Sequence, residues 1–320
     1  MSESKIRVAQ FFSSKYDMKE QFYSKLYFGL ERSDITPLEM MVKYKVEAPK
    51  KGIDCDVSEK AVRIYKECYE YLVNSEGPSL INGSTCKYQL KASSGMNFVG
   101  DTMTSFLTTF KEYLGVYHCI ILDDGKNVPI GERKGTGSNA NVEHWMIYTE
   151  ECIDNGTLKI SDNMRKFIEL NHTIGNQCPV PECFNSNRSN FGKWDFWDLT
   201  LLSIYRWYKE NEQLNIGKDD TVDTALIKMF EKGKDKFKAI ENTKKWLLLH
   251  MTWNNFVKAN HFQDFVENIG PEEFGEPEFF WEGHSFVDSV PNTKKKVDAL
   301  LESCSRMIEA RGERIEQHFL

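Results

Sequence analysis

The chain has 320 residues, of which 40% are hydrophobic, 28% are charged and 13% are aromatic. This balance is that of an ordinary globular protein, and the aromatic content argues against disorder, because aromatic side chains supply much of a core's buried area. The 41 basic and 48 acidic residues give a formal net charge of −7. A globally cationic protein that coats nucleic acid is therefore excluded, whereas a local basic groove is not.

The first third of the chain is predicted to begin with helices. Apolar residues recur at helical spacing in residues 6–30, and Ser58 can cap a second helix that reaches Leu72. Gly77-Pro78 should interrupt regular structure, and Leu80–Leu90 suits a strand or an irregular connection.

The next segment is predicted to hold a helix and a strand. Gly100-Asp101-Thr102 should open the helix, with Asp101 as its N-cap and a buried stripe that begins at Met103. Val116–Leu122 is short, β-branched and apolar, which indicates a buried strand. Residues 123–141 are rich in Gly, Asn and Lys, and we expect an exposed, mobile loop there.

The second half of the chain is more clearly helical. Apolar residues from Trp194 to Tyr208 step by three and four, which is typical of an amphipathic helix, and helices are expected near 220–232 and 236–258. Residues 269–292 contain several prolines and should be irregular, and Asn292 or Thr293 should cap a final helix. The sequence thus predicts an α+β fold that is mainly α-helical, with helices around a small mixed central β segment.

Length alone suggests about two domains. We nevertheless predict one integrated unit over 1–320, with an N-terminal helical part (1–76), a mixed centre (77–200) and a C-terminal helical part (201–320). No secretory signal begins the chain, and no stretch approaches the roughly 18 apolar residues that span a membrane. We therefore expect a soluble, cytoplasmic protein with no membrane partner.

The eight cysteines are scattered and form no CxxC pair, so we expect reduced thiols. Cys68 and Cys304 fall on apolar helical stripes and should be buried. Cys178 and Cys183 are close in sequence, and with His172 they could bind zinc, although the two prolines between the cysteines make a poor zinc knuckle.

The most informative polar residues lie between Glu143 and Lys193. Glu143-His144 comes first, Ile174-Gly175-Asn176 follows, and an Asn-rich loop that ends near Phe191 and Lys193 comes last. In this order they resemble the HNH (His-metal finger) nuclease domain of GmrSD-type restriction proteins. The chain departs from that family at Tyr148, where the family usually has a proline, and it lacks a framing pair of cysteines.

This resemblance implies metal-dependent cleavage of a phosphodiester, in which a neutral histidine deprotonates a water and a divalent cation stabilises the leaving oxygen. Mg²⁺ or another divalent metal would be the cofactor. The implied roles are His144 as general base, Glu143 and Asn190 as metal ligands, Asn185 or Asn187 as the residue that orients the histidine ring, and Arg188 and Lys193 as phosphate contacts.

A second resemblance covers more of the chain and is to an uncharacterised bacterial and phage protein family. It is carried by Gly100-Asp101-Thr102-Met103-Thr104-Ser105-Phe106, His172-Thr173-Ile174-Gly175-Asn176, Phe184-Asn185 with Arg188, Asp195 to Leu201, Gln263 to Val266, and Gly283-His284. It implies one integrated unit but no known activity. It also implies that a set of polar residues gathers in one place: Asp101, His172, Asn176, Asn185, Arg188 and Asp198. Thr102, beside Asp101, could contact phosphate or sugar hydroxyls. We expect the ligand-binding residues to be Asp101, Thr102, His172, Asn176, Arg188 and Lys193.

Each of these features also has a structural explanation. His144 can be a half-buried histidine beside Trp145, and Gly175-Asn176 can simply end a helix that has His172 near its C-terminus. The asparagines of the loop can be turn residues.

Two functions remain open from the sequence. The first is a metal-dependent HNH-like nuclease or related phosphodiester enzyme in bacterial or phage conflict, such as phage defence. The second is a non-enzymatic sensor or inhibitor that binds a nucleotide or a protein partner through the same polar residues. Both require a polar site near 172–193, which would hold an anionic ligand in an otherwise acidic chain.

Overall fold

A computed structural model gives the fold of the chain. It describes residues 68–81, 85–117, 119–121, 127–129, 161–170, 173–188, 196–212 and 221–319. The predictions for residues 6–30, for the start of the helix that Ser58 would cap and for Trp194 lie outside these residues. That helix was predicted to reach Leu72, and this was wrong, because Cys68 is its last helical residue and Leu72 begins a strand.

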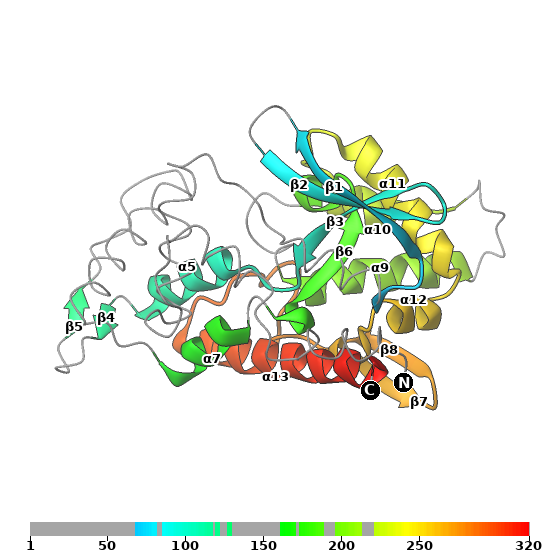
Figure 1. The fold of residues 1–320 in the computed structure, drawn as a ribbon. Coiled ribbons are helices and arrows are strands. Elements are labelled where there is room, and N and C mark those ends of the chain that lie inside the picture. The colour runs from blue at the N-terminus through cyan, green and yellow to red at the C-terminus, as the bar shows by residue number, and fades with distance from the viewer. Residues whose placement is uncertain are drawn as a thin grey trace.

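A four-stranded antiparallel sheet occupies the centre of the fold (Figure 1). Its strands are β1 (Leu72–Ile81), β2 (Thr85–Ala92), β3 (Asn97–Thr102) and β6 (Gln177–Pro181), in the order β1-β2-β3-β6. The β3–β6 pair joins distant parts of the chain and sets Asp101 opposite Cys178. Every residue of β6 is buried, so this edge of the sheet is covered by helices and loops.

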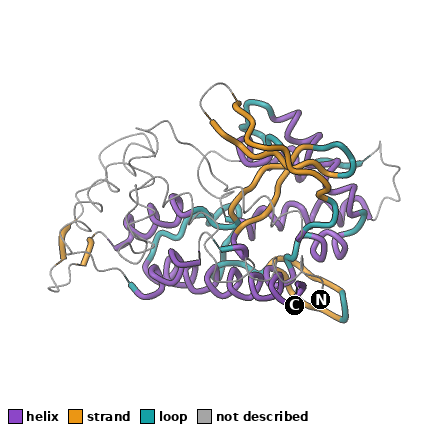
Figure 2. Tube along the Cα trace, viewed as in Figure 1, coloured by secondary structure: helices purple, strands orange, loops and turns teal. Residues whose placement is uncertain are grey.

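Most of the helices lie beside or below this sheet in the view of Figure 2. They are α5 (Phe106–Tyr117), α7 (Asp162–Leu170), α8 (Phe184–Arg188), α9 (Trp197–Glu212), α10 (Thr224–Met229), α11 (Lys236–His250), α12 (Trp253–Ala259) and α13 (Lys294–Phe319), with short 3-10 turns η3 (Ile174–Asn176) and η5 (Gln263–Phe265). The long α13 lies along one side of the molecule and packs against α7, α5 and η3 (Figure 1). Two small antiparallel pairs complete the described fold, namely β4 (Cys119–Ile121) with β5 (Asn127–Pro129) and β7 (Val266–Gly270) with β8 (Glu273–Pro277). The prediction of a mainly helical α+β fold is confirmed.

The core is built from the apolar stripes that the helical periodicity predicted. The buried side chains of α13 are Val297, Leu300, Leu301, Cys304, Met307, Ile308 and Ile315, together with polar Ser305 and Arg311. The α9 stripe of Trp197, Leu201, Ile204 and Tyr208 is buried as well. Each large apolar side chain removed from water contributes roughly 1.5–3 kcal/mol, so these stripes hold the helices in place.

The prediction that Asp101 caps a helix was wrong. Residues 97–102 form β3, and α5 begins only at Phe106. Gly100 pairs with Pro179 of β6, and the Asp101 carboxylate is taken up by a distant arginine described below. Local sequence could not distinguish these cases, because an aspartate ahead of an apolar stripe looks like an N-cap in either setting.

Regular structure is continuous where an interruption was expected and is broken where a single helix was expected. Gly77-Pro78 is part of β1, which lies at the edge of the sheet and accommodates the proline with a shift in register between Glu76 and Pro78. The helix expected over 236–258 is broken after His250, where Met251 adopts a left-handed φ of 66°. Thr252 then caps α12 by accepting a hydrogen bond from the Asn255 backbone N–H.

Other boundaries moved by a few residues. The apolar segment Val116–Leu122 is shared between the end of α5 and the three residues of β4, and β5 lies inside the predicted loop 123–141. Part of the irregular stretch 269–292 belongs to the β7–β8 hairpin. The final helix is confirmed, and its first turn is capped by Thr293 Oγ1, which accepts from the Lys296 N–H.

In the part of the chain that the structure describes, no helix is both long and apolar enough to cross a membrane. Cys68 and Cys304 are buried, as their positions on apolar stripes predicted, and Cys178 is buried in β6. Burial raises the pKa of the Cys178 and Cys304 thiols, so both stay protonated and unreactive at neutral pH.

Candidate functional site

The structure describes about half of the candidate site residues. Asp101, Thr102, Asn176, Asn185, Asn187 and Arg188 are described, whereas Glu143, His144, His172, Asn190 and Lys193 lie outside the described residues. The described residues lie on β3, η3 and α8, which meet near β6.

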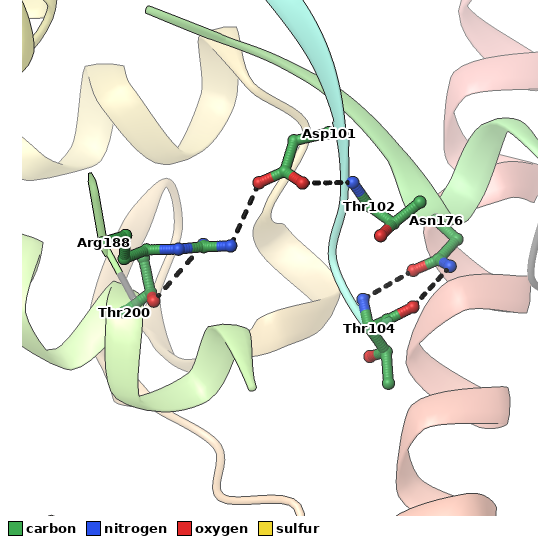
Figure 3. Close-up of polar contacts among 6 residues, drawn as sticks. All are labelled: Asp101, Thr102, Thr104, Asn176, Arg188 and Thr200. Carbon is green, nitrogen blue, oxygen red and sulfur yellow. Dashed lines mark hydrogen bonds and ion pairs between the residues drawn. The ribbon is translucent and has the colours of Figure 1, made fainter. Parts of the chain in front are cut away.

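Asp101 and Arg188 form a buried ion pair between β3 and α8. Arg188 Nη2 donates to Asp101 Oδ2 at 3.1 Å, and the two side chains are only 2% and 5% exposed. The other carboxylate oxygen of Asp101 accepts from the Thr102 backbone N–H at 2.8 Å, and Arg188 Nη1 donates to Thr200 Oγ1 at 3.4 Å (Figure 3). This pair joins residues that are 87 positions apart.

Aromatic rings enclose the Arg188 guanidinium. Its central carbon lies 5.1 Å from the ring centroids of both Phe184 and Trp197. The guanidinium therefore faces the protein interior, and the phosphate contact predicted for Arg188 is replaced by a structural role. Removing either member of such a pair leaves an uncompensated buried charge, which costs about 3–5 kcal/mol.

Asn176 connects η3 to the end of β3. Its side-chain Nδ2 donates to the Thr104 carbonyl oxygen at 3.1 Å, and its Oδ1 accepts from the Thr104 N–H at 2.9 Å (Figure 3). The Asn176 carbonyl oxygen also accepts from the Met103 N–H. Because Asn176 is fully buried, these bonds satisfy backbone groups that the β3–β6 ladder leaves beyond its last pair.

Gly175 is required by a close helix contact. A Cβ at this position would lie 1.8 Å from the Ile308 carbonyl oxygen of α13. The alternative explanation of Gly175-Asn176 as a helix end is not what the structure has, because α7 ends earlier, at Leu170. The glycine instead allows the backbone of η3 to touch the backbone of α13.

Asn187 joins α8 to the loop before α11. Its Nδ2 donates to the Cys183 carbonyl oxygen at 2.9 Å, and its Oδ1 accepts from the Asp235 N–H at 2.7 Å. Gly233 packs so closely on Asn187 that a Cβ there would lie 2.7 Å from the Asn187 Cβ. Both ends of the amide are thus engaged, which gives Asn187 a structural role in place of orienting a histidine ring. Asn185, on the other side of α8, is exposed.

Asp198 and His284 form a second buried polar pair. His284 Nδ1 hydrogen-bonds Asp198 Oδ2, and both side chains are fully buried. The same carboxylate accepts from the Phe280 and Leu199 N–H groups at 3.0 and 2.8 Å. The histidine ring stacks on Trp281, with the ring centroids 3.5 Å apart. Asp198 and His284 both appeared in the sequence signature, but nothing in their spacing indicated that they touch.

Arg311, a buried residue of α13, was not predicted from the sequence to be functional. Its guanidinium donates six hydrogen bonds, to the carbonyl oxygens of His261, Asn260, Ile174, Gly175 and Gln177 and to the Tyr69 hydroxyl. One signal was available, because Arg311 follows Ile308 by three residues and precedes Ile315 by four, which places it on the apolar face. Arg311 fixes η3 and the start of β6, from which the candidate segment continues.

The residues proposed to bind metal are not among those described. Within the described ranges, no group of three or more His, Cys, Asp or Glu side chains could hold a metal ion. Of the alternative zinc ligands, Cys178 is buried in β6 and His172 lies outside the described residues.

Comparison with known proteins found no matching family model, no matching curated protein and no matching solved structure. The two resemblances drawn from sequence motifs stay predictions. The functional assignment therefore depends on the contacts described above and on the chemistry of the motif residues.

Proposed function

We propose that the protein is a metal-dependent, HNH-like phosphodiester enzyme that acts on nucleic acid in bacterial or phage conflict. One observation supports this more than any other, namely that segment 174–188 is held at both ends. Thr104 binds Asn176 at one end, and Asp101 binds Arg188 at the other. The segment carries the second motif and the start of the Asn-rich loop, so the loop begins from a rigid platform, which is how catalytic loops are usually presented.

In this proposal the polar residues divide into a frame and a reactive group. Asp101, Asn176, Asn187 and Arg188 form the frame, since all four are buried and hydrogen-bonded to other elements. The reactive group consists of Glu143, His144, Asn185, Asn190 and Lys193. The exposure of Asn185 supports its assignment to the second group.

The chemistry assigned to the reactive group follows from its side chains. A neutral His144 accepts a proton from the attacking water, and Asn185 holds the imidazole ring in position. Lys193 offsets the charge of the phosphate. Glu143 and Asn190 would hold Mg²⁺ through the oxygen ligands that it prefers, and the cation, when bound, would supply charge stabilisation for the leaving group.

Cleavage of labelled DNA and RNA with and without Mg²⁺ or Mn²⁺ tests this proposal. We expect metal-dependent cleavage that is lost in His144→Ala without a lower melting temperature. Asn185→Ala should slow cleavage, whereas Asn163→Ala, an exposed asparagine of α7, should not. If the wild type without metal and His144→Ala both behave like the metal-loaded wild type, the nuclease proposal is wrong.

A non-enzymatic sensor or inhibitor is the second candidate, and the engagement of Asn187 and Arg188 favours it. Two polar residues that the nuclease resemblance would use for chemistry are instead used for packing. Such a protein would bind a nucleotide or a protein partner without turnover. A nucleotide that raises the melting temperature, in a protein that cleaves no substrate with any metal, would support this candidate over the enzyme.

A further inference from the structure

A lysine-rich segment lies directly beside the candidate site, between α10 and the first turn of α11. Residues 232–238 read Lys-Gly-Lys-Asp-Lys-Phe-Lys, so four lysines accompany one aspartate in a chain whose net charge is −7. Glu231 adds one more carboxylate at its edge. We name residues 232–238 the lysine segment.

An exposed aromatic ring stands in the middle of the lysine segment. Phe237 is 78% exposed. The Lys236 ammonium lies 5.3 Å from the centroid of its ring. A phenylalanine ring buries a large apolar area when it is covered, so a ligand that covers Phe237 would gain this burial beside the lysine charges.

The charges of the lysine segment are only partly compensated. Lys238 forms an exposed ion pair with Glu182 at 3.3 Å. Lys232 and Lys234 are exposed, and neither pairs with a carboxylate of the residues that the structure describes. These two ammonium groups remain available to an external anion.

The lysine segment is fixed to the frame of the candidate site. The Asp235 N–H donates to Asn187 Oδ1 at 2.7 Å, and Gly233 packs against the same asparagine. Asn242 of α11 also donates to the Glu182 carbonyl oxygen at 3.0 Å. The segment is therefore attached to α8, which carries the exposed Asn185.

We propose that the lysine segment binds single-stranded nucleic acid, with Phe237 stacking on a base and the lysines contacting phosphates. Stacking on an exposed ring requires a free base face, which a single strand offers and an intact duplex does not. The flanking lysines supply the salt-dependent attraction to the backbone. This inference rests on the proposed function in one respect, since it names single-stranded nucleic acid as the substrate class of that site.

Binding is measured on the full chain in EDTA by fluorescence anisotropy, so that cleavage does not enter. The probes are labelled single-stranded DNA and RNA of about 12 nucleotides and a matched duplex. Lys234→Glu/Phe237→Ser should weaken single-strand binding about tenfold or more. The matched control is Lys295→Glu/Ile269→Ser, which changes an exposed lysine and an apolar side chain that is 64% exposed elsewhere.

The supporting result is tighter binding of a single strand than of the duplex, with loss in the lysine-segment variant and retention in the control. The proposal is overturned if both variants bind the single strand like the wild type, or if both lose affinity for it equally. It is also overturned if the duplex binds as tightly as the single strand, or if polyglutamate displaces the probe as well as an unlabelled strand does. Failure of His144→Ala to affect cleavage would refute the nuclease without changing this binding result. Wild-type binding by the lysine-segment variant, in a protein whose metal-dependent cleavage is lost in His144→Ala, would refute only the role of the lysine segment.

Discussion

The side chain of Arg188 reaches across from α8 to the carboxylate of Asp101 on β3, 3.1 Å away in the protein interior. Both residues were expected to bind a ligand, and the structure uses them to hold two elements together. The buried pair thus supports the candidate site from within, whereas other candidate residues such as Asn185 are exposed beside it.

Arg188→Met should destabilise the fold by about 3–5 kcal/mol, because it removes the Arg188 guanidinium from the buried Asp101 carboxylate. The double variant Asp101→Leu/Arg188→Met should recover much of this loss, since it removes both charges together. Urea denaturation monitored by tryptophan fluorescence measures the free energy of unfolding. A single variant within 1 kcal/mol of the wild type, or a double variant that adds the two losses, would contradict the prediction.

Gly175→Ala should also be strongly destabilising, because the new methyl group would lie 1.8 Å from the Ile308 carbonyl oxygen. Backbone atoms on both sides must then move apart, and the expected loss is about 3 kcal/mol or more. Gly270→Ala is a matched control, since its closest neighbour is the flexible Glu273 carboxylate at 3.3 Å. Equal melting temperatures for the two variants would show that η3 and α13 are not in tight contact.

Arg311→Lys should lower the free energy of unfolding by on the order of 4 kcal/mol, even though it keeps the charge. The reason is that a lysine has three N–H donors, whereas Arg311 makes six hydrogen bonds. The carbonyl oxygens around it would be left buried and unsatisfied. Arg306→Lys on the same helix changes only an exposed pair with Glu278 and should stay within about 0.5 kcal/mol of the wild type. Chemical denaturation measures the free energy of unfolding of the two variants. A loss for Arg311→Lys as small as that of the control would contradict the structural role of Arg311.

The parts of the fold that could be predicted were those with a local signal. The stripe from Val297 to Ile315 and the Thr293 cap are visible in consecutive turns of one helix, so periodicity was enough to find them. The same holds for α9, whose tryptophan and leucine positions follow helical spacing. Periodicity says nothing about which helix packs on which strand, so the β3–β6 pairing was not foreseen.

The candidate site could be predicted less well, because its contacts are long-range. Asp101 and Arg188 were correctly suspected of a shared location, but their separation of 87 residues hid the ion pair and made Asp101 look like a helix cap. Arg311 was missed because a charged residue within an apolar stripe is usually solvated at its tip. Only the tertiary fold shows that five backbone carbonyl oxygens converge on its guanidinium.

His250 provides a pH-dependent prediction. Burial at the end of α11 lowers the pKa of His250 to about 4 from its ordinary value of 6.5. Its ring lies against Tyr71 and Phe256, and its Nε2 faces the Asn260 amide nitrogen at 3.5 Å, an arrangement that suits the neutral imidazole.

The sign follows from which state binds the proton. Above about pH 6.5 both states hold a neutral His250, so its contribution is fully present, and as pH falls towards 4 only the unfolded chain takes up the proton. The wild type should therefore lose up to about 3 kcal/mol between pH 6.5 and 4 through this residue. His250→Phe lacks the titrating group, so the unfolding free energy of His250→Phe minus that of the wild type should rise as pH is lowered. Because the other histidines are common to both proteins, a difference that stays constant over this range would mean that His250 is protonated in the folded state as readily as in the unfolded one.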